Sequence, residues 1–511
     1  MKRTSTIVFL SLVAVLAYWT CIAQADVRVP KTITDNAVLQ RGVPVNVWGW
    51  ADPGEKVSVT FGQATAQAVA GADGRWTAKL PAMEAALVGK DLVITGKNVL
   101  TLHNVVVGEV WVCGGQSNME QPLNSWGQAR LACTEEEVNG DYSFVRYNRA
   151  VHMLAAEPLE DVECPGWIEC KNGDQKRCTA AGFHFAVRLH KELGVPVGLI
   201  DVNWGGSKID WWMPDDGWKL LPELESYVGD MQKARDLILK APGYKKATTA
   251  MSTTAYTKQC PNKIGAMYNA MMAAWTKYTI RGAIWYQGCS NTSDREVYYY
   301  KQKAMIAQWR KVWNQGDFPF YWVQLANFTA VVEDPNVSGN WPALRDAQTK
   351  CLDVANTGQA VIIDIGETND IHPRNKFDVG NRLAFWALAN LFGQKIDFKS
   401  PMFKEMKIQG NKAVVKFDSV GSGLIVGRKD GRLPVYEDTD AKLTRFAVAG
   451  ADQKWYWADA KIVAKDTVVL SCDKVAQPVA VRYAWQANPL GCNLYSKEGL
   501  PATPFRTDDW K

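Results

Sequence analysis

The feature that most constrains the fold is a regular alternation of two kinds of segment in the middle of the chain, between residues 108 and 400. Amphipathic segments of helix length, such as AAGFHFAVRLHKELG and VYYYKQKAMIAQWRKVWNQG, alternate with short apolar segments of strand length. The apolar segments are VPVGLIDVNW, IRGAIWYQG, FPFYWVQLAN and QAVIIDIG. Helices that alternate with buried strands are typical of an α/β domain with a mostly parallel sheet. We therefore expect such a domain over residues 108–400.

Both flanks of this region have a β pattern instead. Residues 26–107 alternate apolar and polar side chains between Pro-Gly and Gly-rich turns, as in PVNVWGWADPGEKVSVTFG, and this pattern predicts a small β-sandwich. Residues 401–511 return to short β segments, such as MKIQGNKAVVKF and DTVVLSC, and predict a second β-rich domain. A chain of 511 residues is long enough for these three domains.

The first 25 residues predict a secretory signal. MKR is a cationic start, TIVFLSLVAVLAYW is too short to span a bilayer comfortably, and AQA before Asp26 fits a small-residue cleavage site. The mature chain is expected to start at Asp26 and to be exported, to the periplasm or the extracellular space. No later apolar run reaches the length of a transmembrane helix, so no membrane span is expected.

Composition excludes some partners and cofactors. The net charge is only +5, with basic and acidic residues interspersed, so nucleic-acid binding is not expected. Twenty-two tryptophans favour a carbohydrate partner, because indole rings form flat platforms, although most are expected in the core. Paired CxxC and HExxH motifs are absent, so neither a metal nor another cofactor is expected. Ten cysteines remain after the signal and allow disulfides, for which the best candidates are Cys164, Cys170 and Cys178.

Four loops at the ends of predicted strands carry polar residues that could support chemistry. They are GGQSNM, NWGGSKIDWW, WYQGCSNT and NDIHPRNK. Because open parallel sheets gather their ligands at the carboxyl ends of the strands, these loops are expected to line one site. Glycines followed by small polar residues can present backbone N–H groups to an oxyanion. Each loop alone is more often an ordinary turn.

Ser117 in GGQSNM is the candidate nucleophile, and a nucleophilic serine usually needs an imidazole base. His372 stands in a polar loop after a predicted buried strand, followed by Pro373, which stiffens the loop. Asp370 lies two residues earlier, so in an extended segment both side chains start on the same side of the chain. A role for this segment in capping the next helix is the alternative. The other histidines lie in strand-like, irregular or helical patterns: His103, His152, His184 and His190.

The motifs around these residues point to one family. The G-x-S-x-G elbow of α/β-hydrolases is absent, because Asn118 and Met119 follow Ser117. Over essentially the whole mature chain, the sequence instead resembles the sialate O-acetylesterase family of SGNH-type hydrolases. Five motifs in the same order carry the resemblance: GEVWVCGGQSNMEQP, VNWGGSKIDWW, GAIWYQGCSN, NDIHPRNK with VGNRLAFWAL, and NLYSKEGLPATPFRTD.

The resemblance implies a flavodoxin-like α/β/α SGNH hydrolase core with additional β-sandwich domains. It implies that the chain removes O-acetyl groups from sugars or glycans, most of all from sialic acids, by a metal-free serine mechanism. The nucleophile is the serine of GQSNM and the base is the histidine of DIHP, which are Ser117 and His372 here. Members of this group also deacetylate plant polysaccharides, so an acetylxylan or acetyl-xyloglucan esterase is the alternative. The oligomeric state stays open.

Two positions depart from the family pattern. Members usually read QGESN, where this chain has Cys289 in place of the acid. The usual SGNH acid stands three residues before the histidine, where this chain has Asn369. We therefore assign the acid to Asp370, with a carboxylate from elsewhere as the alternative. Asp378, at the start of a predicted helix, is more simply a helix N-terminal residue and serves as the comparison.

The resemblance also suggests groups that stabilise the developing oxyanion. They are the backbone N–H of Ser117, that of Gly205, and a side-chain amide, for which Gln287 is preferred and Asn291 is the alternate. Gly205 is preferred to Gly206 because the SGNH glycine usually stands two residues before a serine or threonine. Three tryptophans near these loops are candidate sugar platforms, with a place in the core as the equal alternative: Trp211, Trp212 and Trp285.

Two other classes of protein stay open on the sequence alone. One is a non-catalytic carbohydrate-binding protein with a dead hydrolase core, against which the intact Ser117 and His372 argue. The other is an SGNH lipase or thioesterase, which needs a long apolar acyl groove. The Trp-rich, polar loops favour a sugar with a short acyl group instead.

Overall fold

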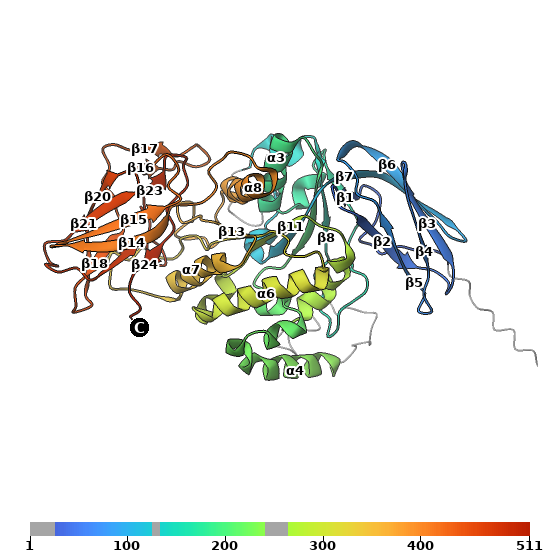
Figure 1. The fold of residues 1–511 in the computed structure, drawn as a ribbon, viewed down its shortest axis with the longest axis horizontal. Coiled ribbons are helices and arrows are strands. Elements are labelled where there is room, and N and C mark those ends of the chain that lie inside the picture. The colour runs from blue at the N-terminus through green and yellow to red at the C-terminus, as the bar shows by residue number, and fades with distance from the viewer. Residues whose placement is uncertain (1–25, 125–132, 241–263, 511) are drawn as a thin grey trace, which may run out of the picture.

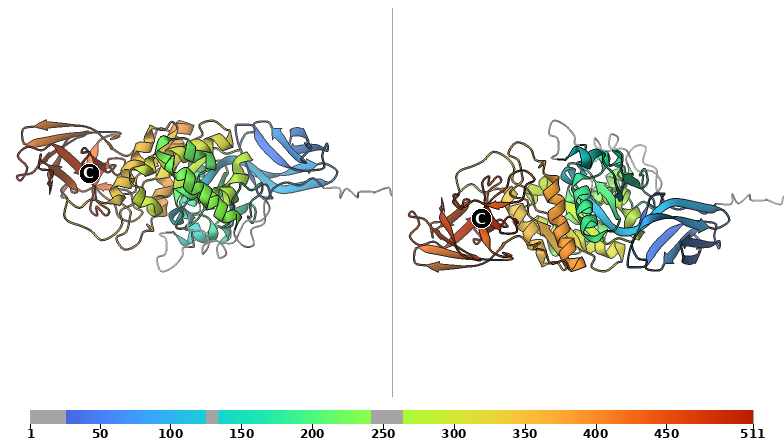
Figure 2. Two further views of the ribbon diagram at one scale, coloured as in Figure 1. Left: turned by 90° about the horizontal axis from the view of Figure 1, so that it is seen from below. Right: turned by 90° about the horizontal axis from the view of Figure 1, so that it is seen from above.

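The computed structural model describes residues 26–124, 133–240 and 264–510. The predicted signal, residues 1–25, and Cys260 lie outside these ranges. A central α/β body carries an N-terminal β part at one end of its long axis and a C-terminal β part at the other (Figures 1 and 2). The predicted α/β class with additional β-sheets is confirmed.

The central sheet has the strand order β13-β12-β11-β7-β10-β8-β9. All its strand pairs are parallel except β8 with β9. The carboxyl ends of the parallel strands therefore meet at one edge, as the alternating pattern predicted. The strands are β7 (Val99–Gly115), β8 (Tyr142–Arg149), β9 (Ile168–Cys170), β10 (Val197–Asn203), β11 (Gly282–Tyr286), β12 (Phe320–Val323) and β13 (Thr357–Ala360).

Helices cover both faces of this sheet (Figure 1). Along β7, Trp111 and Cys113 face one apolar core together with residues of α3 and α8, whereas Val110 and Val112 face the other with residues of α6. Side chains that alternate between two buried faces explain why the strands read as continuous apolar runs. The helices are α1 (Ser117–Glu120), α2 (Glu135–Asn139), α3 (Ala180–Leu193), α4 (Ser226–Leu239), α6 (Val297–Trp313), α7 (Asn340–Lys350) and α8 (Lys376–Phe392).

The long strand β7 joins the N-terminal β part to the central sheet. Its first half pairs with β6 and β1, and its second half pairs with β10 and β11. The predicted boundary between residues 107 and 108 thus falls inside a continuous strand. The other N-terminal strands are β1 (Val38–Gln40), β2 (Val45–Trp50), β3 (Lys56–Phe61), β4 (Ala64–Val69), β5 (Arg75–Leu80) and β6 (Ala86–Thr95).

The C-terminal β part packs on the segment that follows β13, because Val361 and Ile363 belong to its apolar core. Its strands are β14 (Met402–Gln409), β15 (Lys412–Asp418), β16 (Leu424–Arg428), β17 (Tyr436–Glu437), β18 (Phe446–Ala449), β19 (Trp455–Trp457), β20 (Asp459–Ala464), β21 (Thr467–Ser471), β22 (Ala480–Tyr483), β23 (Leu494–Ser496) and β24 (Phe505–Arg506).

Two further expectations concern cysteines and membranes. The nine cysteines in the described ranges are free thiols, and the candidates Cys164, Cys170 and Cys178 are among them. The expected disulfide is therefore not formed in the structure. Within the same ranges, no helix combines the length and the apolar character needed to cross a bilayer.

Candidate active site

Ser117 stands where the central strand β7 ends. Gly115 closes the strand with a φ of 141°, and a Cβ atom at this position would lie 2.3 Å from the carbonyl oxygen of Tyr286 in β11. Only glycine allows this approach of two backbones. The chain then turns through Gln116 into α1, so that Ser117 is the first residue of a short helix. Gln116 Oε1 accepts a hydrogen bond from the N–H of Gly288 at 3.2 Å, which ties this turn to the end of β11.

The structure brings Ser117, His372 and Asp370 together in one hydrogen-bonded path. Ser117 Oγ lies 2.9 Å from His372 Nε2. On the other side of the ring, His372 Nδ1 lies 3.1 Å from Asp370 Oδ1. The same carboxylate oxygen accepts the backbone N–H of His372 at 2.9 Å, which fixes the loop between β13 and α8. A hydroxyl, an imidazole and a carboxylate in this order can generate a nucleophile.

The surroundings keep His372 in the form that accepts a proton. Partial burial lowers the pKa of His372 below the usual 6.5, and the positive charge of Lys376 lowers it further. Asp370 opposes both effects and raises the pKa. Because the effects that lower the pKa outweigh those of Asp370, the imidazole is mainly neutral at neutral pH, as a general base must be.

The other two carboxylates that could serve as the triad acid form ion pairs with residues other than His372. Asp378 lies in the first turn of α8, where Asn375 caps its backbone N–H and Lys429 Nζ lies 2.6 Å from its carboxylate. Asp364 is buried and forms a two-pronged ion pair with Arg382, at 2.6 and 2.7 Å. Of the three, only Asp370 contacts His372.

The backbone donors near Ser117 differ in how they are used. The N–H of Ser117, at the start of α1, has no acceptor among the described residues, as is usual for the first turn of a helix. The N–H of Gly205 donates to the carboxylate of Glu120. Gly205 still lies against the nucleophile, because a Cβ at this position would be 3.4 Å from Ser117 Cβ. For Gly205 to serve an oxyanion, its bond to Glu120 would have to break.

The two amides predicted for the oxyanion are buried inside the protein. Gln287 Nε2 donates to Asn291 Oδ1 at 2.7 Å, to Gln116 Oε1 at 3.1 Å and to the carbonyl of Ser207 at 3.1 Å. Asn291 Nδ2 donates to Asp210 Oδ2 at 2.9 Å and also to Asp294. These amides connect the loops after β7, β10 and β11, and they have no donor left for substrate.

The predicted sugar platforms need correction. Trp212 and Trp285 are fully buried and contact each other edge to face, so they belong to the core rather than to a sugar site. Trp211 is half-buried and packs against the same core. Sequence analysis missed the half-buried Trp204, which stacks on His152 with 4.5 Å between ring centroids and precedes Gly205. Trp204 and Trp211 are both half-buried and both pack against this core, so these two are the candidates that keep an exposed edge.

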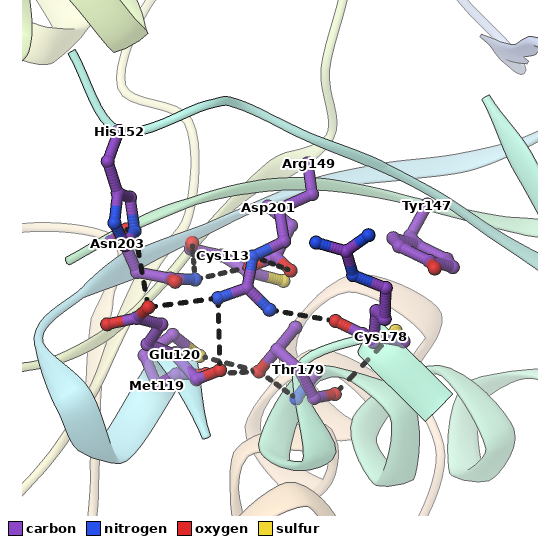
Figure 3. A network of polar contacts seen from close by, with 12 residues as sticks. Cys113, Met119, Glu120, Tyr147, Arg149, His152, Cys178, Thr179, Asp201 and Asn203 are labelled. Atoms are coloured by element: carbon purple, nitrogen blue, oxygen red, sulfur yellow. Dashed lines mark hydrogen bonds and ion pairs between the residues drawn. The ribbon is translucent and has the colours of Figure 1, made fainter. Parts of the chain in front are cut away.

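Sequence analysis also missed an ion-pair network around Glu120 (Figure 3). Glu120 Oε1 lies 3.1 Å from Arg149 Nη2 and 3.2 Å from His152 Nε2. These residues line a cavity of about 780 Å³, together with Lys176 and Arg177. Glu120 follows Ser117 by three residues on α1, so the cavity adjoins the nucleophile's helix. The size of the cavity suits a sugar ring with its substituents.

A serine, a histidine and an aspartate joined at the carboxyl edge of a parallel sheet are typical of hydrolases that act through a covalent intermediate. Comparison with known proteins agrees with this class. Residues 107–385 match the family model described as carbohydrate esterase, sialic acid-specific acetylesterase. The chain therefore belongs to this family of carbohydrate esterases and is a carboxylic ester hydrolase.

Individual relatives span nearly the whole chain. The sialate O-acetylesterase of Homo sapiens is 26% identical and covers 94% of this chain and 92% of its own length. That of Mus musculus is 25% identical and covers 90% of both chains. A crystal structure of a carbohydrate acetylesterase from Xanthomonas citri is 34% identical, covers 95% of this chain and 100% of its own, and has a TM-score of 0.80.

The acid can be tested with a matched pair of substitutions. Asp370→Asn is expected to lower kcat by about 10²- to 10⁴-fold with little change in folding, because the imidazole loses the carboxylate that orients it. Asp378→Asn removes a carboxylate six residues from His372 and is expected to keep turnover near normal. Combining Asp370→Asn with His372→Ala should add little to the loss from His372→Ala alone. Steady-state kinetics on p-nitrophenyl acetate check this, and normal turnover of Asp370→Asn would refute the assignment.

The pH dependence follows from the lowered pKa of His372. The base works in its neutral form, so kcat/KM should fall only when the pH drops through a midpoint below 6.5. Asp370 raises the pKa of His372, so Asp370→Asn should move this midpoint to still lower pH. The measurement is the pH profile of kcat/KM for both proteins. An acid midpoint above 6.5, or an upward movement in the variant, would contradict the electrostatic account.

Proposed function

We propose that this chain is an exported serine esterase that removes O-acetyl groups from carbohydrates, most of all from sialic acids. The observation that carries the proposal is the path from Asp370 through His372 to Ser117 Oγ, with contacts of 3.1 and 2.9 Å. Sialate O-acetylesterases aligned over nine-tenths of the chain support the acyl group and the sugar class. The signal-like residues 1–25 support export.

The geometry supports a two-step reaction. His372 Nε2 takes the proton of Ser117 Oγ as the oxygen attacks the acetyl carbonyl carbon. The tetrahedral intermediate collapses to an acetyl-enzyme, and the imidazolium returns its proton to the departing sugar oxygen. Water, deprotonated by His372, then attacks the acetyl-enzyme; the bond between the acetyl carbon and Ser117 Oγ breaks, acetate leaves, and the imidazolium returns its proton to Ser117 Oγ. Asp370 holds the ring and stabilises its charged form, and none of these steps calls for a metal or another cofactor.

The oxyanion in this proposal binds at the start of α1. The N–H of Ser117 is available there, because it has no acceptor among the described residues. Gly205 lies against Ser117 and supplies the second donor once Glu120 releases its N–H. Losing one such donor typically costs on the order of 10²-fold or more in rate.

We also propose the finer fold assignment, a flavodoxin-like SGNH hydrolase core with domains at 26–107, 108–400 and 401–511. A parallel sheet with helical layers on both faces supports the core. Two apolar clusters made almost wholly of residues after 401 support a C-terminal domain, which also takes Val361 and Ile363 into its core. The N-terminal boundary is the least distinct, because strand β7 and one apolar cluster continue across it.

The alternative substrate is an acetylated plant polysaccharide such as xylan or xyloglucan. The Xanthomonas citri relative, at 34% identity, is named only as a carbohydrate acetylesterase, which fits either sugar class. The cavity beside Glu120 is lined by three cationic side chains, from Arg149, Lys176 and Arg177, against two carboxylates, from Glu120 and Glu163. This balance favours an acidic sugar over a neutral one.

Acetate release from a panel of substrates tests the proposal. The purified protein is expected to deacetylate O-acetylated sialic acid faster than acetylated xylan or xyloglucan fragments, and acetyl esters faster than octanoyl esters. Ser117→Ala should abolish release from every substrate while the protein stays folded. Faster release from a neutral polysaccharide would favour the alternative substrate. Binding without release by the folded wild-type protein would favour a carbohydrate-binding protein.

A further inference from the structure

A buried lysine lies directly behind the proposed site. Lys376 is the first residue of α8, and its side chain is almost fully buried. Its Nζ donates a hydrogen bond to Asn118 Oδ1 at 2.6 Å. The Nδ2 of the same asparagine donates to the carbonyl of Ile371 at 3.0 Å. Asn118 follows Ser117 and Ile371 precedes His372, so this chain of contacts links the nucleophile's helix to the histidine loop.

The charge of Lys376 has no close anionic partner. Within the described residues Lys376 forms no ion pair; its Nζ contacts Asn118 Oδ1, and its ammonium group lies 5.3 Å from the ring centroid of Tyr286. Burial lowers the pKa of Lys376 to about 7, against the opposing effect of four more distant groups. The four groups that raise the lysine pKa lie on three segments of the chain: Cys133 before α2, Cys289 after β11, and Glu367 and Asp370 in the loop before α8.

Cys289 occupies the position where the resembling family usually has a glutamate. Cys289 follows Tyr286, whose ring centroid lies 5.3 Å from the Lys376 ammonium group, by three residues, and a negative charge at position 289 would raise the pKa of Lys376. Burial raises the pKa of the Cys289 thiol to about 12, so the side chain is neutral at neutral pH. A glutamate here would place a carboxylate beside the lysine, whereas this chain leaves the positive charge without one.

We propose that Lys376 is a positioning residue: its Nζ holds Asn118 between Ser117 and the loop of His372, and it places a buried cation without an ion-pair partner among the described residues behind the catalytic base. The inference rests on the proposed function, because it concerns the same serine and histidine. It also gives the replacement of the family's acid by Cys289 a physical consequence. The site keeps a neutral base at lower pH than a site with a neutralised lysine would.

The direction of the effect follows from the charges. The positive charge of Lys376 lowers the pKa of His372, second only to burial among the causes. Removing that charge, or placing a carboxylate beside it, should therefore raise the pKa of His372. The acid midpoint of activity should then move to higher pH, because a smaller fraction of the base is neutral at a given pH.

Two kinds of substitution separate the hydrogen bond from the charge. Lys376→Gln keeps an N–H donor for Asn118 and removes the charge, whereas Lys376→Met removes both. Cys289→Glu supplies the missing carboxylate, and Cys289→Ser is its uncharged control. Folding of each variant is followed by thermal unfolding, and the Cys289 pair still decides the electrostatic claim if a Lys376 variant fails to fold.

The first measurement is the titration of His372 by NMR without substrate, with its resonance assigned by comparison with His372→Ala. The midpoint should rise by about half a pH unit or more in Lys376→Gln, Lys376→Met and Cys289→Glu, and should not move in Cys289→Ser. The second is the pH profile of kcat and KM on p-nitrophenyl acetate. It should show the same movement, with kcat lower in Lys376→Met than in Lys376→Gln and KM little changed.

Unchanged midpoints in folded Lys376→Gln and Lys376→Met, or an equal response to Cys289→Glu and Cys289→Ser, would overturn the inference. A loss of stability without any change in the titration of His372 would also overturn it, because that result describes a purely structural lysine. The NMR titration of His372 does not depend on catalysis, so it tests the inference about Lys376 by itself. The proposed function is tested by ester hydrolysis, and a wild-type protein that hydrolyses no ester would refute that function without deciding the role of Lys376.

Discussion

The hydrogen bond between Ser117 Oγ and His372 Nε2 is the interaction on which the rest of the account depends. It joins residues 255 positions apart at 2.9 Å, so two distant parts of the fold must be held rigidly against each other. The glycine at the end of β7 brings two backbones into contact and aims Ser117 out of the sheet. On the other side, Asp370 fixes both the backbone and the ring of His372. Asn118 closes the arrangement with a second link, to Ile371.

Two buried charged residues near this contact differ in whether they have an oppositely charged partner. Glu120 is buried but contacts Arg149 and His152, and burial raises the pKa of the neighbouring Asp201 to about 6 against the influence of Arg149. Lys376 has an amide oxygen and the face of a tyrosine ring as its described contacts, and Asp370 and Glu367 raise its pKa without forming an ion pair with it. Removing two charges from water costs less when they are paired, so the unpaired lysine is the more expensive of the two arrangements. Such a cost is common where a site needs a charge in a particular place.

Much of this could be predicted from the sequence, because it is encoded locally. Short apolar runs between amphipathic segments predicted the parallel sheet, and polar loops after those runs predicted Ser117, His372 and Asp370, which the structure brings together.

The site residues that were predicted wrongly or missed share a physical cause: their roles depend on contacts between distant parts of the chain. Trp212 and Trp285 lie near the right loops, but which way a side chain points depends on packing across the sheet. Gln287 and Asn291 have suitable donors, but neighbouring loops use all of them. Glu120 contacts Arg149 of β8 and His152 of the segment after β8. Both partners lie outside the motif that contains Glu120, so the residue spacing within that motif could not predict these contacts.

The most direct test of the central claim is to trap the covalent intermediate. The protein is mixed with an excess of p-nitrophenyl acetate, quenched in acid within the first turnovers, digested, and analysed by peptide mass spectrometry. We expect one acetyl group on the peptide that contains Ser117, on the Ser117 side chain, and none on that peptide from Ser117→Ala. Acetate release by the wild-type protein with the acetyl group on another residue, or continued turnover by Ser117→Ala, would contradict the claim that Ser117 is the nucleophile.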